Sequence, residues 1–164
     1  MIRVDTAAQT LSAFGVTYPC AIGRAGVDDG DAKREGDGMT PRGRYTIRTV
    51  LARPGRTAVT TAMPFRWLRP DDGWSDDPAD PAYNRPVRHP HRWSAEQLWR
   101  DDGLYDLIVT LAHNDSPPQA GLGSAIFLHC WNAGNPTEGC VAIEKAALIA
   151  IVEQLKPGAR IEIC

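Results

Sequence analysis

The 164-residue chain has no apolar stretch that approaches the roughly 20 residues of a membrane-spanning helix. Its 18 lysines and arginines are scattered rather than gathered into a block, and the net charge is only −2. The four cysteines include no CxxC pair, and they are too few for a disulfide scaffold. We therefore expect no membrane span, no nucleic-acid partner and no structural zinc site.

The N-terminus lacks the pattern of a signal peptide, because no apolar core follows Met1–Asp5. We expect a cytoplasmic protein, export by a route that the sequence does not display, or a precursor longer than this sequence. Hydrophobic residues make up 43% and charged residues 23%, which is ordinary for a globular chain. The length predicts one domain over residues 1–164, and we expect a monomer.

Most of the predicted elements are strands. In residues 44–51, side chains that favour burial alternate with polar side chains, as in a half-buried strand. Residues 2–5 and 11–14 are expected to pair as a hairpin, and the glycine-rich, charged stretch 23–43 to form a long loop. The remaining expected strands are 16–22, 104–112, 125–130 and 160–163. The pattern predicts a mainly β fold with peripheral helices.

Two helices and one long insertion complete the predicted layout. Ser94 is a plausible N-cap with Gln97 three residues later, which favours a helix over 94–101. Leu148, Ile151, Val152 and Leu155 have helical spacing within 144–155. Residues 64–92 carry six prolines and many aspartates, which excludes a regular helix or a central strand. We expect a long ordered insertion there.

The most informative stretch is 124–143, SAIFLHCWNAGNPTEGCVAI. An apolar run delivers His129, and after a polar loop Gly139 and Cys140 stand at the entry to another apolar run. A cysteine nucleophile needs a base within hydrogen-bond reach, so we interpret Cys140 as the nucleophile and His129 as its base. Gly139 allows a close approach to a ligand, and the amides of Gly139 and Cys140 are candidate oxyanion donors.

The residue types fit this chemistry. A free cysteine is only a few per cent thiolate at neutral pH, and a nearby imidazole could accept its proton and hold the thiolate as an ion pair. The imidazole needs an orienting partner, for which the carbonyl of Cys130 is one candidate. Strand alternation turns the Cys130 side chain away from His129. The alternative to this interpretation is that Cys140 is a buried cysteine without a catalytic role and that His129 is unrelated to it.

These motifs resemble the L,D-transpeptidase catalytic domain, also called the YkuD domain. In that family a histidine precedes a Ser/Thr-X-Gly-Cys segment, here Thr137-Glu138-Gly139-Cys140, with ten residues between His129 and Cys140. The upstream segment GDGMTPRGRY at 36–45 is similar to the family's G-D-x-x-T-P-x-G-x-[FY]. The resemblance extends over about 18–163. It implies a β-sandwich or barrel-like fold and no metal or organic cofactor.

The resemblance also implies an activity. Cys140 would form a thioester with a peptidoglycan stem peptide, release D-alanine and pass the acyl group to an amine, and a carbapenem would acylate the same thiol. The family implies the cell envelope or periplasm as the compartment. Many members carry histidine where this chain has Glu138, so that histidine's role does not transfer.

Several interpretations stay open. The same site could serve an L,D-carboxypeptidase or amidase, or the chain could be a silent wall-binding module. His89 and His91 with His113 or His129 could instead bind zinc, and a Cys20–Cys130 bridge stays possible in an oxidising compartment. Candidate substrate-binding residues are Asn114, Trp131, Arg42, Arg44, Tyr83 and Arg85.

Overall fold

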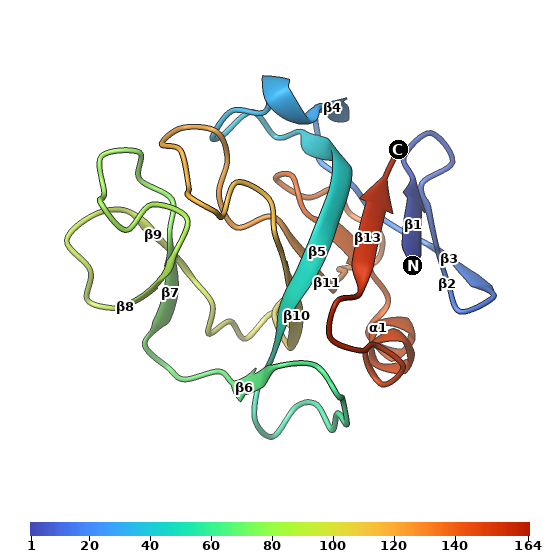
Figure 1. Cartoon of the computed structure of the whole chain (residues 1–164). Coiled ribbons are helices and arrows are strands. Elements are labelled where there is room, and N and C mark those ends of the chain that lie inside the picture. Colours follow the sequence, from blue (N-terminus) through green and yellow to red (C-terminus); the bar gives the residue numbers. More distant parts are fainter.

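The computed structural model describes the backbone of residues 1–164 and the burial of every residue except Gly30, and its fold is mainly β, as predicted. Figure 1 shows a long central strand with a small sheet on one side and the single α-helix on the other. The strands are β1 (Ile2–Asp5), β2 (Thr10–Ala13), β3 (Val16–Pro19), β4 (Val27–Asp29), β5 (Thr40–Ala52), β6 (Phe65–Trp67), β7 (Asp72–Ser75), β8 (Pro86–Arg88), β9 (Ala95–Gln97), β10 (Leu107–Leu111), β11 (Phe127–Cys130), β12 (Val141–Ile143) and β13 (Arg160–Ile163). The helices are α1 (Lys145–Val152) and the short 3₁₀ turn η1 (Gly30–Ala32).

The main sheet has the order β12-β11-β10-β5-β13-β1-β2-β3, with β4 and β6 also paired to β5. The predicted hairpin is confirmed as β1 and β2, which pair antiparallel with Val4 opposite Leu11. β5 is longer than the predicted 44–51, and it spans both halves of the sheet. Tyr45 and Ile47 point into the core as the alternation predicts.

The two faces of the sheet carry separate apolar cores. One face packs against α1, where Leu148, Ile151 and Val152 are fully buried and Leu155 follows just beyond the helix. The opposite face holds a second cluster around Phe127 and Cys140. Because neighbouring strand residues alternate, Leu128 belongs to the first core and Phe127 to the second.

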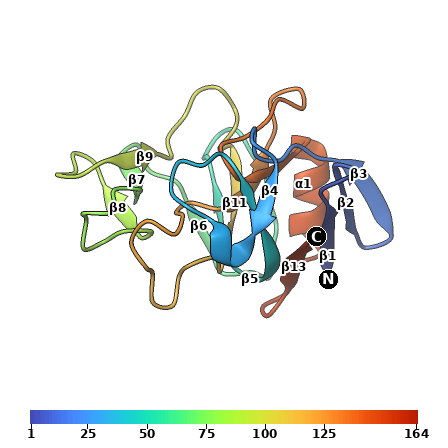
Figure 2. The same ribbon diagram turned by 90° about the horizontal axis from the view of Figure 1, so that it is seen from above.

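Strands β7 and β8 of the insertion, with β9 just beyond it, form a separate three-stranded sheet, β8-β7-β9, beside the main sheet (Figures 1 and 2). The predicted helix over 94–101 is wrong, because Ala95–Gln97 forms strand β9 and pairs antiparallel with β7. A one- or two-turn helix has little stability of its own, and pairing with β7 supplies the backbone hydrogen bonds instead. Pro86 lies at the start of an outer strand, where its missing N–H costs no ladder bond.

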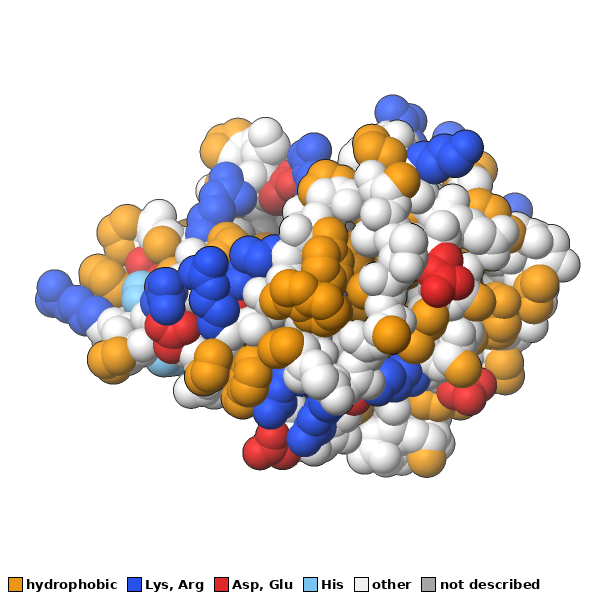
Figure 3. Space-filling view, turned by 90° about the horizontal axis from the view of Figure 1, so that it is seen from below, with side chains coloured by type: hydrophobic (Ala, Val, Ile, Leu, Met, Phe, Trp, Pro, Cys, Tyr) orange, Lys and Arg blue, Asp and Glu red, His pale blue; other side chains and the backbone are white. Residues whose placement is uncertain are grey.

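The surface distribution of charge is mixed. Seen from below, Lys and Arg side chains gather on the insertion side of the molecule with Asp and Glu side chains among them (Figure 3). Within the insertion Arg66 pairs with Asp72 at 2.7 Å, and Arg88 pairs with Asp71. In the described part of the chain, no helix has the length and apolar character needed to cross a bilayer.

Candidate active site

Strands β11 and β12 bring the two predicted catalytic residues to one face of the sheet. They pair in parallel, with His129 opposite Ala142 and Leu128 opposite Val141. Cys140 therefore stands directly before β12 and shares a face with Phe127 and His129. The side chain of Cys130 lies on the other face, in the core around α1, as the alternation predicts.

A cavity of about 420 Å³ opens over this face and is lined by Cys140, Gly139 and His129. Its other walls come from the loop that follows η1, from the insertion, from β9 and the segment after it, and from the residues just before β11. Their charged and polar side chains include Lys33, Glu35, Asp76, Glu96, Arg100, Tyr105, Ser124 and Glu138. A thiol, an imidazole and several charged groups thus meet in one concave site, which is the usual setting for a reactive residue.

The sulfur of Cys140 is held by the backbone. The thiol donates to the carbonyl of Ala125 at 3.1 Å, and the N–H of Phe127 donates to the sulfur at 3.3 Å. Ala125 adopts φ +53°, which is unusual for a residue with a side chain, and the side chain of Asn84 accepts its N–H at 3.1 Å. Asn84 therefore fixes the segment that positions the thiol.

The imidazole of His129 has a clear orienting partner. Its Nδ1 lies 2.7 Å from the carbonyl oxygen of Cys130, the candidate that the sequence suggested. A proton on Nδ1 leaves Nε2 as the acceptor, which is the tautomer a general base needs. The ring of Tyr105 packs edge-on against the imidazole at a centroid distance of 5.2 Å, and the Tyr105 hydroxyl donates to Glu96.

Burial sets the charge state of the pair. Burial, together with the nearby charge of Glu96, raises the pKa of the Cys140 thiol to about 12. Burial also lowers the pKa of His129 to about 4. At rest both groups are therefore neutral, rather than the ion pair expected from the sequence, so the thiol could act as a nucleophile only if its proton were transferred during attack.

The glycine-cysteine turn is tightly built. Gly139 has φ +143°, and a Cβ there would lie 2.9 Å from the carbonyl oxygen of Met39, so the position needs glycine. The hydroxyl of Thr137 donates to the Cys140 carbonyl at 2.6 Å and accepts the Gly139 N–H at 3.1 Å. The predicted Gly139 oxyanion donor is thus engaged in the resting structure.

The upstream GDGMTP segment supports this turn from the other side. Thr40 donates to the Cys140 carbonyl at 3.4 Å and accepts the N–H of Gly23 at 2.8 Å. Asp37 accepts from the backbone N–H groups of Arg34 and Met39, both at 2.8 Å. These contacts explain why the two motifs, about a hundred residues apart in sequence, belong to one site.

The six candidate substrate-binding residues lie outside the residues that line the cavity. Tyr83 comes nearest, because its hydroxyl donates at 2.8 Å to Glu35, which does line it. Arg42 and Arg44 pair with Asp29 at 3.7 Å and with Glu162 at 2.8 Å. The side chain of Asn114 braces its own loop, Trp131 packs beside Gly134, and Arg85 is exposed at a smaller pocket. Their roles in binding stay predictions.

The histidines have separate partners. His91 pairs with Asp80 at 2.6 Å, and His113 lies 3.1 Å from the carbonyl of Leu122. Among the residues described, no three histidine, cysteine or acidic side chains are grouped as metal ligands. All four cysteines, Cys20 and Cys130 included, are free thiols. Glu138 is exposed and pairs with Arg24 at 2.9 Å.

Several site residues escaped the sequence analysis. Lys33 was expected in a solvated charged loop, yet it is 3% exposed and faces the cavity. Glu96 was placed on a helix that does not form. Tyr105 lies near the start of a predicted strand and Asn84 within the predicted insertion, and neither carries a further sequence signal. Tertiary contacts place Tyr105 in the cavity with Cys140 and Asn84 against Ala125.

Comparison with known proteins agrees with this architecture. The chain is similar to Bd1075 of Bdellovibrio bacteriovorus, with a TM-score of 0.54 and 18% identity over 100% of this chain and 47% of that one. An L,D-transpeptidase from Mycobacterium smegmatis gives a TM-score of 0.44 and 15% identity, over 99% of this chain and 57% of that one. The chain thus spans about half the length of these two structures. No curated protein matches.

The family assignment comes from the sequence profile. The profile described as the L,D-transpeptidase catalytic domain, YkuD, matches residues 1–163, which include the upstream motif, the base-bearing strand and the glycine-cysteine turn. The likeness to Bd1075 supports a shared fold at low identity. With all but the last residue matched, the chain belongs to the L,D-transpeptidase catalytic domain (YkuD) family.

Proposed function

We propose that the protein is a cysteine acyltransferase that acts on peptidoglycan stem peptides through a thioester on Cys140. The observation that carries the proposal is the cavity in which Cys140, Gly139 and an oriented His129 meet, in a chain whose family is that of L,D-transpeptidase catalytic domains. The compartment that this activity implies, the cell envelope, is part of the proposal.

The chemistry follows from the neutral resting pair. His129 accepts the thiol proton as the Cys140 sulfur attacks the amide carbonyl between meso-diaminopimelate and D-alanine. The C–N bond then breaks, His129 returns the proton to the leaving amine, and D-alanine departs. An amine of a second stem attacks the thioester, His129 takes up its proton, and the thiol is restored as the new amide forms.

The backbone would support the negative oxygen of the intermediate. The amides of Gly139 and Cys140 are its proposed donors. The Gly139 N–H would have to leave the hydroxyl of Thr137, to which it donates in the resting structure. The Gly139 N–H would thus have a hydrogen-bond partner before substrate binds and would become available to the oxyanion during the reaction.

The test uses purified protein, tetrapeptide muropeptides and mass spectrometry. Wild-type protein should release D-alanine and form cross-linked dimers, whereas Cys140→Ala should do neither. Cys20→Ala is the matched control, because Cys20 is also a buried thiol but packs in the core on the α1 side. Full turnover by Cys140→Ala would refute the proposal.

The products separate the remaining possibilities. Release of D-alanine without dimers would assign the same site to a carboxypeptidase or amidase, with water as the acceptor. A carbapenem offers a second probe, because an acylated Cys140 gains the mass of the drug. Absence of both turnover and adduct would favour a silent wall-binding module.

A further inference from the structure

Lys33 is a buried cation beside the candidate nucleophile. The residue is 3% exposed, and it lines the same cavity as Cys140. Lysine is rarely buried to this degree unless its charge is paired and its position matters. The fold therefore places an ammonium in the wall of the site, where the sequence suggested a solvated loop.

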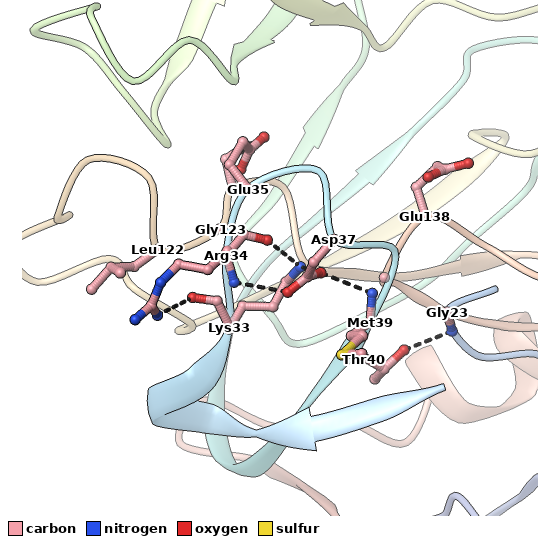
Figure 4. Close-up of polar contacts among 12 residues, drawn as sticks. Gly23, Lys33, Arg34, Glu35, Asp37, Met39, Thr40, Leu122, Gly123 and Glu138 are labelled. Atoms are coloured by element: carbon pink, nitrogen blue, oxygen red, sulfur yellow. Dashed lines mark hydrogen bonds and ion pairs between the residues drawn. The ribbon is translucent and has the colours of Figure 1, made fainter. Parts of the chain in front are cut away.

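Two contacts hold the ammonium in place. Lys33 Nζ forms an ion pair with Asp37 and donates to the carbonyl of Arg34 at 2.9 Å (Figure 4). An ammonium group has three N–H donors, so these contacts leave one donor. Since Asp37 is itself fixed by two backbone N–H groups, the position of Nζ is well defined.

The remaining donor lies near the glycine-cysteine turn. Lys33 Nζ is 3.7 Å from the point where a Cβ on Gly139 would stand. The oxygen of an acyl group attacked by Cys140 develops its negative charge close to this turn. The Gly139 N–H, the expected donor there, is occupied by the hydroxyl of Thr137 at 3.1 Å.

The charge of Lys33 also acts on the thiol. It lowers the pKa of Cys140, and the charge of Glu96 raises it. The titratable and charged groups that line the cavity with the thiol come from several elements: Lys33, Glu35, Asp76, Glu96, Arg100, Tyr105, His129 and Glu138. Arg100 is paired with Asp102, and Glu138 with Arg24. Lys33 is the buried cation of this set, and its ammonium lies beside the glycine-cysteine turn.

We propose that Lys33 is a catalytic residue whose third N–H donates to the oxyanion formed when Cys140 attacks an acyl carbonyl. The inference rests on the proposed function of Cys140. As the C–S bond forms, the carbonyl π electrons move to oxygen and Lys33 stabilises that charge without giving up its proton. When the intermediate collapses, the electrons return, the C–N bond breaks, and His129 supplies the proton to the amine.

The test compares Lys33→Met with wild type in two assays. The first is acylation of Cys140 by a carbapenem, followed by intact mass, which should slow by about 100-fold on loss of an oxyanion donor. The second is alkylation of Cys140 by iodoacetamide across neutral to alkaline pH, located by peptide mapping. Without the cation the thiol ionises less readily, and the rate should fall by about 10-fold at each pH.

Two further variants guard against a folding artefact. Lys33→Met/Asp37→Asn removes both charges, so no unpaired carboxylate is left, and it should lose acylation to the same degree. Lys145→Met is the matched control, because Lys145 also binds one aspartate, Asp106, and one backbone carbonyl, and it should keep wild-type rates.

The outcomes separate this proposal from the proposed function. Wild-type acylation and alkylation rates in a folded Lys33→Met would overturn the role of Lys33 and leave Cys140 as the nucleophile. A wild-type protein that reacts with neither substrate nor carbapenem at Cys140 would overturn both.

Discussion

Asn84 connects the insertion to the segment that holds the Cys140 thiol, and its removal should weaken both the fold and the candidate site. The side chain is 4% exposed and makes four hydrogen bonds. It accepts from Trp74 Nε1 at 2.8 Å and from the Ala125 N–H at 3.1 Å. It donates to the carbonyls of His113 and Asn114, at 3.1 and 2.7 Å.

The expected loss of stability follows from the hydrogen-bonding groups that Asn84→Ala leaves unpaired. Two donors, Trp74 Nε1 and the Ala125 N–H, lose their acceptor, and each unpaired buried donor costs about 1–3 kcal/mol. Asn84 also adopts φ +55°, where alanine is less favourable by roughly 1 kcal/mol. Together these effects predict a loss of about 3–7 kcal/mol in the free energy of unfolding.

The site should respond as well. The carbonyl of Ala125 accepts the thiol of Cys140 at 3.1 Å, so a displaced Ala125 no longer fixes the sulfur. We expect Asn84→Ala to slow acylation of Cys140 even under conditions where the variant is folded. Asn84→Asp keeps an acceptor for Ala125 but loses the two donated bonds, so its stability should fall while more of the acylation rate is retained.

Urea denaturation measures the stability, and intact mass after carbapenem addition measures the rate. Asn132→Ala is the control, because that side chain is exposed and substitution there should change stability by less than about 0.5 kcal/mol. An Asn84→Ala protein with the stability and the acylation rate of the control would refute this reasoning.

Three further predictions concern the cavity. Glu96→Gln should speed alkylation of Cys140 by iodoacetamide, because the Glu96 charge raises the pKa of that thiol; an unchanged or slower rate would contradict this. Gly139→Ala should lower the urea midpoint and the acylation rate, since its Cβ would lie 2.9 Å from the Met39 carbonyl oxygen, and wild-type values for both would count against the role of the turn. The folded-state pKa of His129, about 4, lies below its ordinary 6.5, so the unfolded chain takes up the proton first as pH falls. Stability present above about pH 6.5 should decline by roughly 3 kcal/mol towards pH 4, and His129→Gln should lack this part of the decline.

The strand pattern was predictable because burial in this fold is regular. The alternation in β5, the hairpin of β1 and β2, and the closing strand β13 all follow from local sequence. The same alternation predicted that His129 and Cys130 face opposite sides. Cys130 packs in the core around α1, whereas His129 packs against Tyr105 and lines the cavity with Cys140, which confirms the prediction. Helix α1 was also recognisable, since its buried residues repeat with helical spacing.

The insertion was less predictable, for a physical reason. Its short strands gain their hydrogen bonds from partners distant in sequence, as β7 does from both β8 and β9. Local propensity is then a weak predictor of secondary structure. The Ser94–Gln97 cap spacing predicted a helix, whereas pairing with β7 makes this segment a strand. The cavity residues Glu96 and Tyr105 lie just beyond the insertion, on β9 and on the segment that follows it, so their position beside the thiol also depends on tertiary contacts.

The buried state of Lys33 shows a second limit of sequence reasoning. A lysine followed by other charged residues is typical of a solvated loop. Here the Asp37 carboxylate and a backbone carbonyl hold the ammonium inside the protein. The partner lies only four residues away, yet neither spacing nor composition distinguishes such a pair from two exposed side chains.

Rapid-quench mass spectrometry of the protein with a tetrapeptide stem can detect the proposed thioester itself. We expect an acyl group on the Cys140 sulfur, formed with loss of D-alanine, strongly slowed in His129→Gln and absent in Cys140→Ala. Turnover without any acyl group on Cys140, or with the acyl group on another residue, would contradict it.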